Sequence, residues 1–116
     1  MRNVLAATLL LLALPAHADG YDRISDRGAF VGLVDGKTLR SLGVSLVVTS
    51  SGAIGGRAFG RDITGAWIWD GGLFCRTMQA GDRAFARNCQ VVERQGNRIR
   101  FIADRGTGDV ADLTIR

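Results

Sequence analysis

Residues 51–69 read SGAIGGRAFGRDITGAWIW, and this stretch decides the fold. Four glycines fall within its first ten positions. Such a cluster is typical either of a loop that holds the phosphates of a nucleotide or of the turns and bends of a small β-sheet. The spacing of the glycines and the residues that follow them separate the two interpretations.

The glycine spacing does not fit a dinucleotide-binding loop. Such a loop needs the pattern GxGxxG between a strand and a helix. Ala53 stands where the second glycine is required if Gly52 is the first, and other starting points fit no better. Residues 63–69 then read ITGAWIW, which is rich in β-branched and aromatic residues and has no helical period. We therefore predict a hairpin turn at Gly52 and a bulge or sharp bend at Gly55 and Gly56.

Alternating hydrophobic and polar residues predict an antiparallel all-β domain over most of the chain. Turn-forming clusters of Gly, Asp and Asn separate the runs at intervals of about 8–12 residues. A chain this short has difficulty leaving two sheet edges open, so a small meander that closes into a barrel is favoured. The seven expected strands are 44–49, 53–59, 63–69, 73–79, 87–94, 98–103 and 110–115.

A short helix is expected before the first of these strands, over residues 27–34. Asp26 would cap its N-terminus, and the Asp-Gly pair at 35–36 would end it. The residues on its apolar side would be Phe30, Val31 and Val34.

The first eighteen residues, MRNVLAATLLLLALPAHA, have the features of a secretory signal peptide. Arg2 gives a positive start, residues 4–14 are apolar, and residues 16–18 form a small-x-small cleavage site. The alternative is a membrane anchor, but the apolar run is about half the roughly 20 residues that a spanning helix needs. We expect residues 1–18 to be removed and residues 19–116 to form one periplasmic or secreted domain without a membrane span.

Cys75 and Cys89 are the only cysteines, and an exported chain with two cysteines most simply forms one disulfide. If the strands pair about a turn at 81–83, the two residues stand opposite each other, near bridging distance. The bond would close a loop of roughly 15 residues and stabilise the fold by about 3 kcal/mol.

The only histidine, His17, would leave with the signal peptide. Catalysis by a histidine-dependent triad or a free thiol, and a metal site that uses histidine, are therefore excluded. A site built on carboxylates alone or on arginine stays open, but no catalytic, cofactor or metal residue is predicted.

The charge pattern does not favour a nucleic-acid partner. The chain carries a net charge of +4, and its 15 basic residues are spread among aspartates along the sequence. A nucleic-acid patch would need clustered cations with exposed aromatic residues between them. Residues 104–109 read DRGTGD but lack the spaced carboxylates of calcium loops.

Two groups of residues are candidates for a binding surface. Trp67 and Trp69 would point the same way from one strand, either into the core or as the aromatic wall of a ligand cavity or partner surface. Arg94, Arg98 and Arg100 flank one hairpin and would form either a solvated face or a basic patch for an anion or an acidic partner.

A series of short motifs covers most of the expected mature chain. The most specific are WIWDG at 67–71, FCR at 74–76 and NC at 88–89, accompanied by GKTL at 36–39 and TGAW at 64–67. On these motifs the chain resembles a group of small exported proteins from α-proteobacteria that often carry the name dihydrodipicolinate reductase. That name implies NAD(P)H-dependent reduction in lysine synthesis. The histidine and lysine region of that enzyme has no counterpart here, so no catalytic residue carries over.

The expected architecture is also similar to that of small periplasmic protease-inhibitor and lipocalin-like β-barrels. The sequence thus favours a small disulfide-bonded β domain that binds an unidentified protein or small molecule, at an open end of the barrel. One alternative is an enzyme of the reductase name, and another is a structural envelope protein without a discrete ligand. Fold alone does not decide among these functions.

Overall fold

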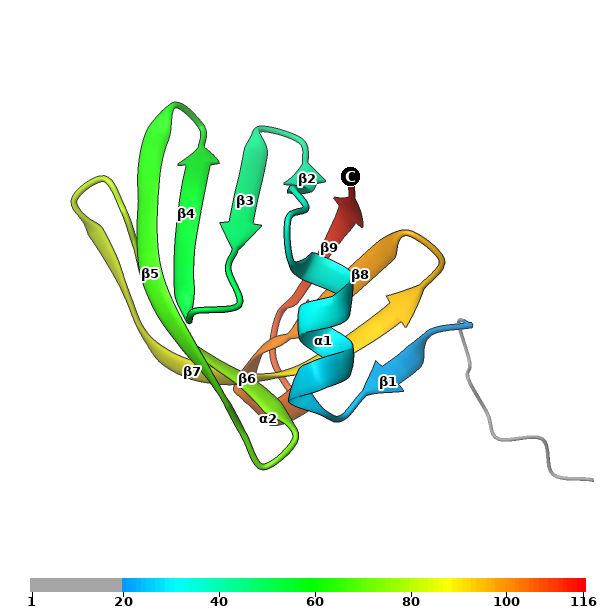
Figure 1. Ribbon diagram of the computed structural model, residues 1–116. Coiled ribbons are helices and arrows are strands. Elements are labelled where there is room, and N and C mark those ends of the chain that lie inside the picture. Colours follow the sequence, from blue (N-terminus) through cyan, green and yellow to red (C-terminus); the bar gives the residue numbers. More distant parts are fainter. Residues whose placement is uncertain (1–19) are drawn as a thin grey trace, which may run out of the picture.

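The computed structural model describes residues 20–116. The predicted signal peptide, residues 1–18, lies outside the described residues. The described chain folds into an antiparallel β-barrel with a short helix packed against it (Figure 1). The elements in chain order are β1 (Asp22–Ile24), α1 (Arg27–Val34), β2 (Leu39–Ser41), β3 (Val44–Val48), β4 (Ala53–Ala58), β5 (Arg61–Asp70), β6 (Leu73–Ala80), β7 (Arg83–Gln95), β8 (Arg98–Ile102), α2 (Ala103–Gly106) and β9 (Val110–Ile115).

Eight strands close the barrel, and one more strand extends its wall. Successive strands from β2 to β9 pair in antiparallel fashion. Pairing of β2 with β9 closes the ring, with Leu39 opposite Ile115. The additional strand, β1, lies beside the C-terminal part of β7, where Ile24 faces Val92. The predicted closed meander is therefore confirmed.

The glycine-rich stretch forms a turn and a strand. Gly52 lies in the turn between β3 and β4, whereas Gly55 and Gly56 lie within β4 and pair with both neighbouring strands. The register is continuous through both residues, so no bulge occurs here. Gly56 has a φ of +124°, and a Cβ atom there would collide with the carbonyl oxygen of Ser45. The close approach of β3 and β4 therefore requires glycine at this position.

Helix α1 has the predicted bounds and the predicted cap. Asp26 Oδ1 accepts a hydrogen bond of 2.8 Å from the backbone N–H of Ala29, which satisfies a donor that the helix leaves unpaired. Phe30 is fully buried, and its ring centroid lies 5.3 Å from that of Trp67 and 5.1 Å from that of Phe74. The helix thus fills part of the barrel interior with an aromatic cluster.

Cys75 on β6 and Cys89 on β7 stand directly opposite each other and form the predicted disulfide. The turn between the two strands is tighter than expected, because β7 already begins at Arg83. A bulge opposite residues 76–78 adds one residue to β7 and shifts the register. This shift brings the two cysteines into register.

Four segments differ from the sequence pattern. Strands β1 and β2 are not predicted, because each has only three residues and shows no alternation. Strand β7 has 13 residues and begins before the predicted range 87–94. Ala103, expected at the end of a strand, begins α2 instead, and Asp104 and Arg105 follow with φ of +54° and +57°.

Candidate ligand-binding site

A cavity of about 140 Å³ lies inside the barrel. Nine of its eleven lining residues are apolar, and the other two are Arg76 and Gln90. Phe74 and Phe101 line the cavity and also contact Phe30, so α1 supports this part of the wall. The other apolar lining residues include Leu39, Leu46, Ile54 and Met78.

Ala111 marks an opening of the cavity. It stands opposite Phe101 across the β8–β9 pair and therefore shares the inner face of the sheet. Ala111 is nevertheless exposed to solvent, whereas Leu113, two residues further along the same face, is 5 % exposed. The small side chain of Ala111 thus leaves the cavity accessible at this point of β9.

Arg76 is the only charged residue that lines the cavity. It stands between Trp67 on β5 and Asn88 on β7. Its Nη1 donates a hydrogen bond of 2.8 Å to the carbonyl oxygen of Ala86, which lies in the bulge of β7. Burial lowers the pKa of the Arg76 guanidinium below the ordinary arginine value. Within residues 20–116, no acidic side chain forms an ion pair with this guanidinium.

Gln90 begins a series of polar contacts that connects the cavity to α2. Its side chain is buried, and Nε2 donates a hydrogen bond of 3.2 Å to Asn88 Oδ1. Asn88 Nδ2 donates to Asp104 Oδ1 at 2.7 Å, and Asn88 Oδ1 accepts from the backbone N–H of Asp104 at 3.0 Å. Asp104 and Arg105 both have positive φ, which costs an L-residue about 1–2 kcal/mol. The contacts of Asn88 hold this strained turn against the barrel.

The two candidate tryptophans pack around α1. Trp67 is 4 % exposed, and its Nε1 donates a hydrogen bond of 2.9 Å to the carbonyl oxygen of Thr49. Trp69 is half-buried, stacks on Phe30 with ring centroids 5.1 Å apart, and donates from Nε1 to the carbonyl oxygen of Ser25 at 3.3 Å. Neither ring lines the barrel cavity. The structure therefore places both residues in core packing, the first of the two alternatives.

The three candidate arginines are divided between two faces of the sheet. Arg94 is the cross-strand partner of the fully buried Ile99 and belongs to the inner face, where its Nε donates to the carbonyl oxygen of Gly96 at 2.9 Å. Arg98 and Arg100 lie on the outer face of β8, since they alternate with Ile99. The hairpin therefore does not bring the three cations together.

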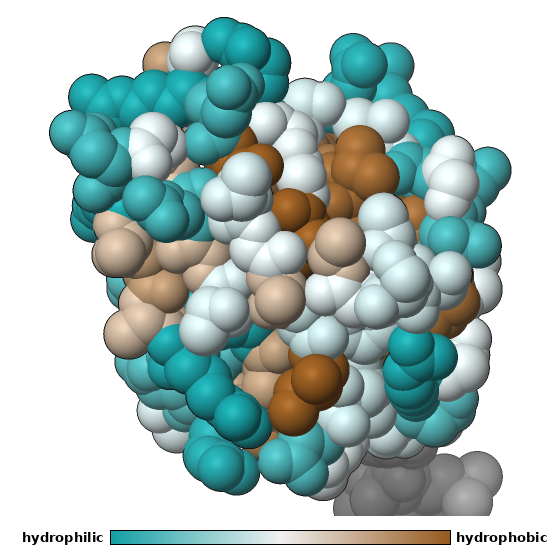
Figure 2. All heavy atoms as spheres, turned by 60° about the vertical axis from the view of Figure 1, so that its left-hand side comes forward, coloured by the Kyte–Doolittle hydropathy of each residue, from teal (hydrophilic) through white to brown (hydrophobic). Residues whose placement is uncertain are grey.

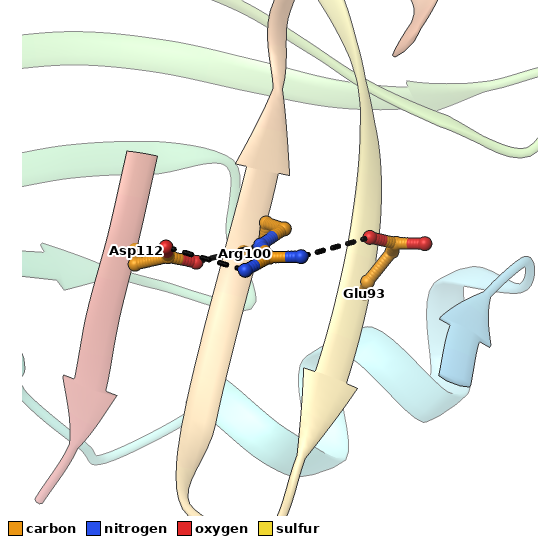
Figure 3. A network of polar contacts seen from close by, with 3 residues as sticks. All are labelled: Glu93, Arg100 and Asp112. Atoms are coloured by element: carbon orange, nitrogen blue, oxygen red, sulfur yellow. Dashed lines mark hydrogen bonds and ion pairs between the residues drawn. The ribbon is translucent and has the colours of Figure 1, made fainter. Parts of the chain in front are cut away.

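Arg100 lies between two carboxylates on the strands that flank β8 (Figure 3). Its Nε donates to Asp112 Oδ1 at 2.8 Å, and its Nη1 lies 4.0 Å from Glu93 Oε1. The guanidinium also covers the ring of Tyr21, 3.9 Å from the ring centroid. These contacts surround the charge of Arg100 with opposite charges and link three strands to the segment before β1.

The exposed hydrophobic residues of the outer surface do not line the cavity. Figure 2 shows hydrophobic residues in several separate groups between hydrophilic ones on the face that it draws. The most exposed are Leu42, at 94 %, and Phe59, at 76 %, on two neighbouring turns. A hydrogen bond of 2.8 Å from the N–H of Phe59 to the carbonyl oxygen of Gly43 joins these turns.

The sequence pattern does not single out Arg76 or Gln90, although each leaves a signal. Arg76 falls between Phe74 and Met78 on the same side of an alternating strand. Gln90 lies two residues before Val92 on another such face. A charged or amide side chain on a face that is otherwise buried is uncommon and marks a position for inspection.

No protein-family model, curated protein or solved structure matches this chain. Over residues 20–116, no helix is long and apolar enough to cross a membrane. The same residues contain no group of three or more His, Cys, Asp or Glu side chains that would hold a metal ion. A functional proposal for this chain therefore rests on the geometry of the barrel cavity.

Proposed function

We propose that this protein is a small-molecule binding module that takes its ligand into the barrel interior. The observation that carries the proposal is the apolar cavity of about 140 Å³. The interior of an eight-stranded barrel is either filled by side chains or holds one small ligand. An apolar cavity of about 150 Å³ in another protein stays dry and binds benzene. The cavity here has a similar size, and nine of its eleven lining residues are apolar.

The disulfide supports this function because it fixes the part of the wall that carries polar groups. Cys75 immediately precedes Arg76 on β6, and Cys89 immediately precedes Gln90 on β7. Alternation places the sulfur atoms on the outer face and the two polar side chains on the inner face. A covalent bond between the strands therefore holds Arg76 and Gln90 in a constant relative position.

The same disulfide, together with the expected signal peptide, supports action in the periplasm or outside the cell. Disulfides persist in these compartments and are rare in a reducing cytoplasm. A ligand-binding module of this kind would meet small molecules present in either compartment.

Thermal unfolding of the oxidised protein comprising residues 19–116 tests the proposal, with benzyl alcohol and 1-hexanol as neutral apolar probes. Ligand at a hundredfold excess over its dissociation constant stabilises the native state by about 2.7 kcal/mol. We expect both probes to raise the midpoint. An equal shift with NADPH instead would favour the reductase alternative.

The variant Ala111→Leu locates the binding event, because a larger side chain closes the cavity opening. We expect this variant to lose the stabilisation by the neutral probes. The matched control is Ala53→Leu, which adds the same atoms at an exposed position adjacent to the inward-facing Ile54. Stabilisation of Ala111→Leu as large as that of Ala53→Leu would show that the probes bind elsewhere, and the proposal would fail.

A further inference from the structure

Arg76 presents the only charge to a cavity that is otherwise lined by apolar residues and Gln90. It is half-buried, and burial lowers the pKa of its guanidinium because desolvation disfavours the charged form. A partly desolvated charge is stabilised by an opposite charge or a hydrogen-bond acceptor beside it. Among residues 20–116 the guanidinium has one hydrogen-bond partner, the carbonyl oxygen of Ala86, and no ion-pair partner. The site thus has a positive charge without a matching negative one.

The geometry of the guanidinium leaves a recognition edge unused. Nη1 donates to Ala86, while no acceptor within residues 20–116 takes a hydrogen bond from Nε or Nη2 of Arg76. Nε and Nη2 together form the planar pair of donors that binds the two oxygens of a carboxylate. Gln90, which lines the same cavity, donates one amide hydrogen to Asn88 and has a second available.

We propose that the ligand of the barrel cavity is a small organic carboxylate, whose anionic group binds Arg76 and whose apolar body lies among Phe74, Met78 and Phe101. This inference rests on the proposed function and specifies the chemical class of its ligand. The cavity volume limits the apolar body to about the size of a benzene ring or a short aliphatic chain. The single cation matches the single charge of a carboxylate, and the cavity offers no second cation for a phosphate dianion.

Isothermal titration calorimetry at pH 7 with benzoate and with benzyl alcohol tests this inference. The two probes have similar size, but only benzoate carries a negative charge. We expect the oxidised 19–116 protein to bind benzoate about tenfold or more tightly than benzyl alcohol, since hydrogen bonds to charged groups are the stronger ones. In Arg76→Gln the preference should disappear, with benzyl alcohol bound within about twofold of the original affinity.

Two further variants control this experiment. Arg98→Gln removes a positive charge from the outer face of the barrel and should leave the preference for benzoate intact. Arg76→Lys keeps the charge without the planar donor pair, so it should retain part of the preference and shows that position 76 tolerates replacement.

The outcomes separate the two proposals. Equal affinity for benzoate and benzyl alcohol, or a benzoate preference that survives in Arg76→Gln, would overturn the carboxylate inference and leave the binding module in place. A loss of preference in Arg98→Gln as large as that in Arg76→Gln would overturn it as well, because net charge alone would then explain the effect. Failure of the wild-type protein to bind either probe would overturn the proposed function itself.

Discussion

Trp67 Nε1 donates a hydrogen bond of 2.9 Å to the carbonyl oxygen of Thr49, and this bond ties the residue that follows β3 to β5. The Trp67→Phe variant keeps an aromatic ring against Phe30 but removes the donor. We expect the free energy of unfolding to fall by about 1–3 kcal/mol, because a partly buried carbonyl loses its partner and a smaller ring leaves space. Equilibrium unfolding in urea measures this loss.

The matched control is Trp69→Phe. Trp69 is half-buried, and its hydrogen bond to Ser25 is longer, at 3.3 Å. This variant should cost less than Trp67→Phe. An equal or greater cost would contradict the assignment of Trp67 as the main polar anchor of the aromatic cluster.

The disulfide between Cys75 and Cys89 should account for a large share of the stability of so small a domain. It closes a loop with a sequence separation of 14, for which the loss of chain entropy in the unfolded state predicts about 3 kcal/mol. We expect the double variant Cys75→Ala/Cys89→Ala to be less stable by about this amount in urea. The wild-type protein under reducing conditions should lose a similar amount. A loss in the double variant that reduction does not reproduce would point to packing of the side chains rather than to the covalent bond.

Local chemistry explains why much of this fold is predictable from the sequence. Asp26 caps α1 within three residues of its own position, so the start of the helix depends on no distant contact. The strands that alternate clearly are found, and so is the pairing of Cys75 with Cys89, because a hairpin turn and two cysteines act over a short sequence range. Strand β1 escapes prediction because its pairing with β7 comes from a distant part of the chain. Strand β2 escapes prediction because its three residues are too few to show an alternation, although it pairs with the neighbouring β3.

The candidate site is less predictable from the sequence. Alternation defines the two faces of a strand, but it does not tell which face points into the barrel. The sequence alone does not distinguish Arg76 from a solvated arginine. The structure shows that Arg76 lies on the same side of β6 as Phe74 and Met78, which line the cavity. The arginines of the β7–β8 hairpin depend on the fold in the same way. They are close in sequence, but the register pairs Arg94 with Ile99 and Glu93 with Arg100. Arg94 therefore lies on the inner face of the sheet and Arg100 on the outer face.

Asn88 should be the residue that holds α2 against the barrel. Asn88→Ala removes two hydrogen bonds to Asp104 and one to Gln90, so we expect a loss of about 2–3 kcal/mol in unfolding free energy. Amide hydrogen exchange in residues 103–109 should also become faster, because the strained turn loses its support. The control is Thr107→Val, which removes a hydrogen bond within the same turn and leaves its attachment to β7 intact. Unchanged exchange in Asn88→Ala would show that the turn holds its conformation without this contact.

Arg105 has an exposed side chain and a φ of +57°, so glycine should suit its backbone better than arginine. We expect Arg105→Gly to raise the unfolding free energy by up to about 1 kcal/mol, since relief of left-handed strain exceeds the entropy that glycine adds to the unfolded chain. Arg98→Gly, at an extended position of β8, should instead lower it by about 1 kcal/mol. Thermal unfolding of the two variants compares them directly, and a loss of stability in both would contradict the strain at position 105.

The contacts of Arg100 should matter more than those of an exposed ion pair. The side chain of Arg100 is 19 % exposed, and Arg100→Ala leaves Glu93 and Asp112 on either side of β8 without their shared cation. It also uncovers Tyr21, and we expect a loss of about 2–4 kcal/mol in urea unfolding.

The comparison for Arg100 is the ion pair of Arg57 with Asp62, whose side chains are 63 % and 81 % exposed. Water and salt screen such a pair, so Arg57→Ala should cost less than about 1 kcal/mol. A salt concentration of 1 M should remove the part of that cost due to the ion pair and leave the part due to the hydrogen bond from Arg57 Nη2 to the carbonyl oxygen of Gly60. The cost of Arg100→Ala should persist in 1 M salt, because lost packing on Tyr21 and two partly buried carboxylates are screened much less. If salt abolished both effects equally, Arg100 would act as a surface charge, and its proposed part in joining β7, β8 and β9 to the N-terminal segment would be wrong.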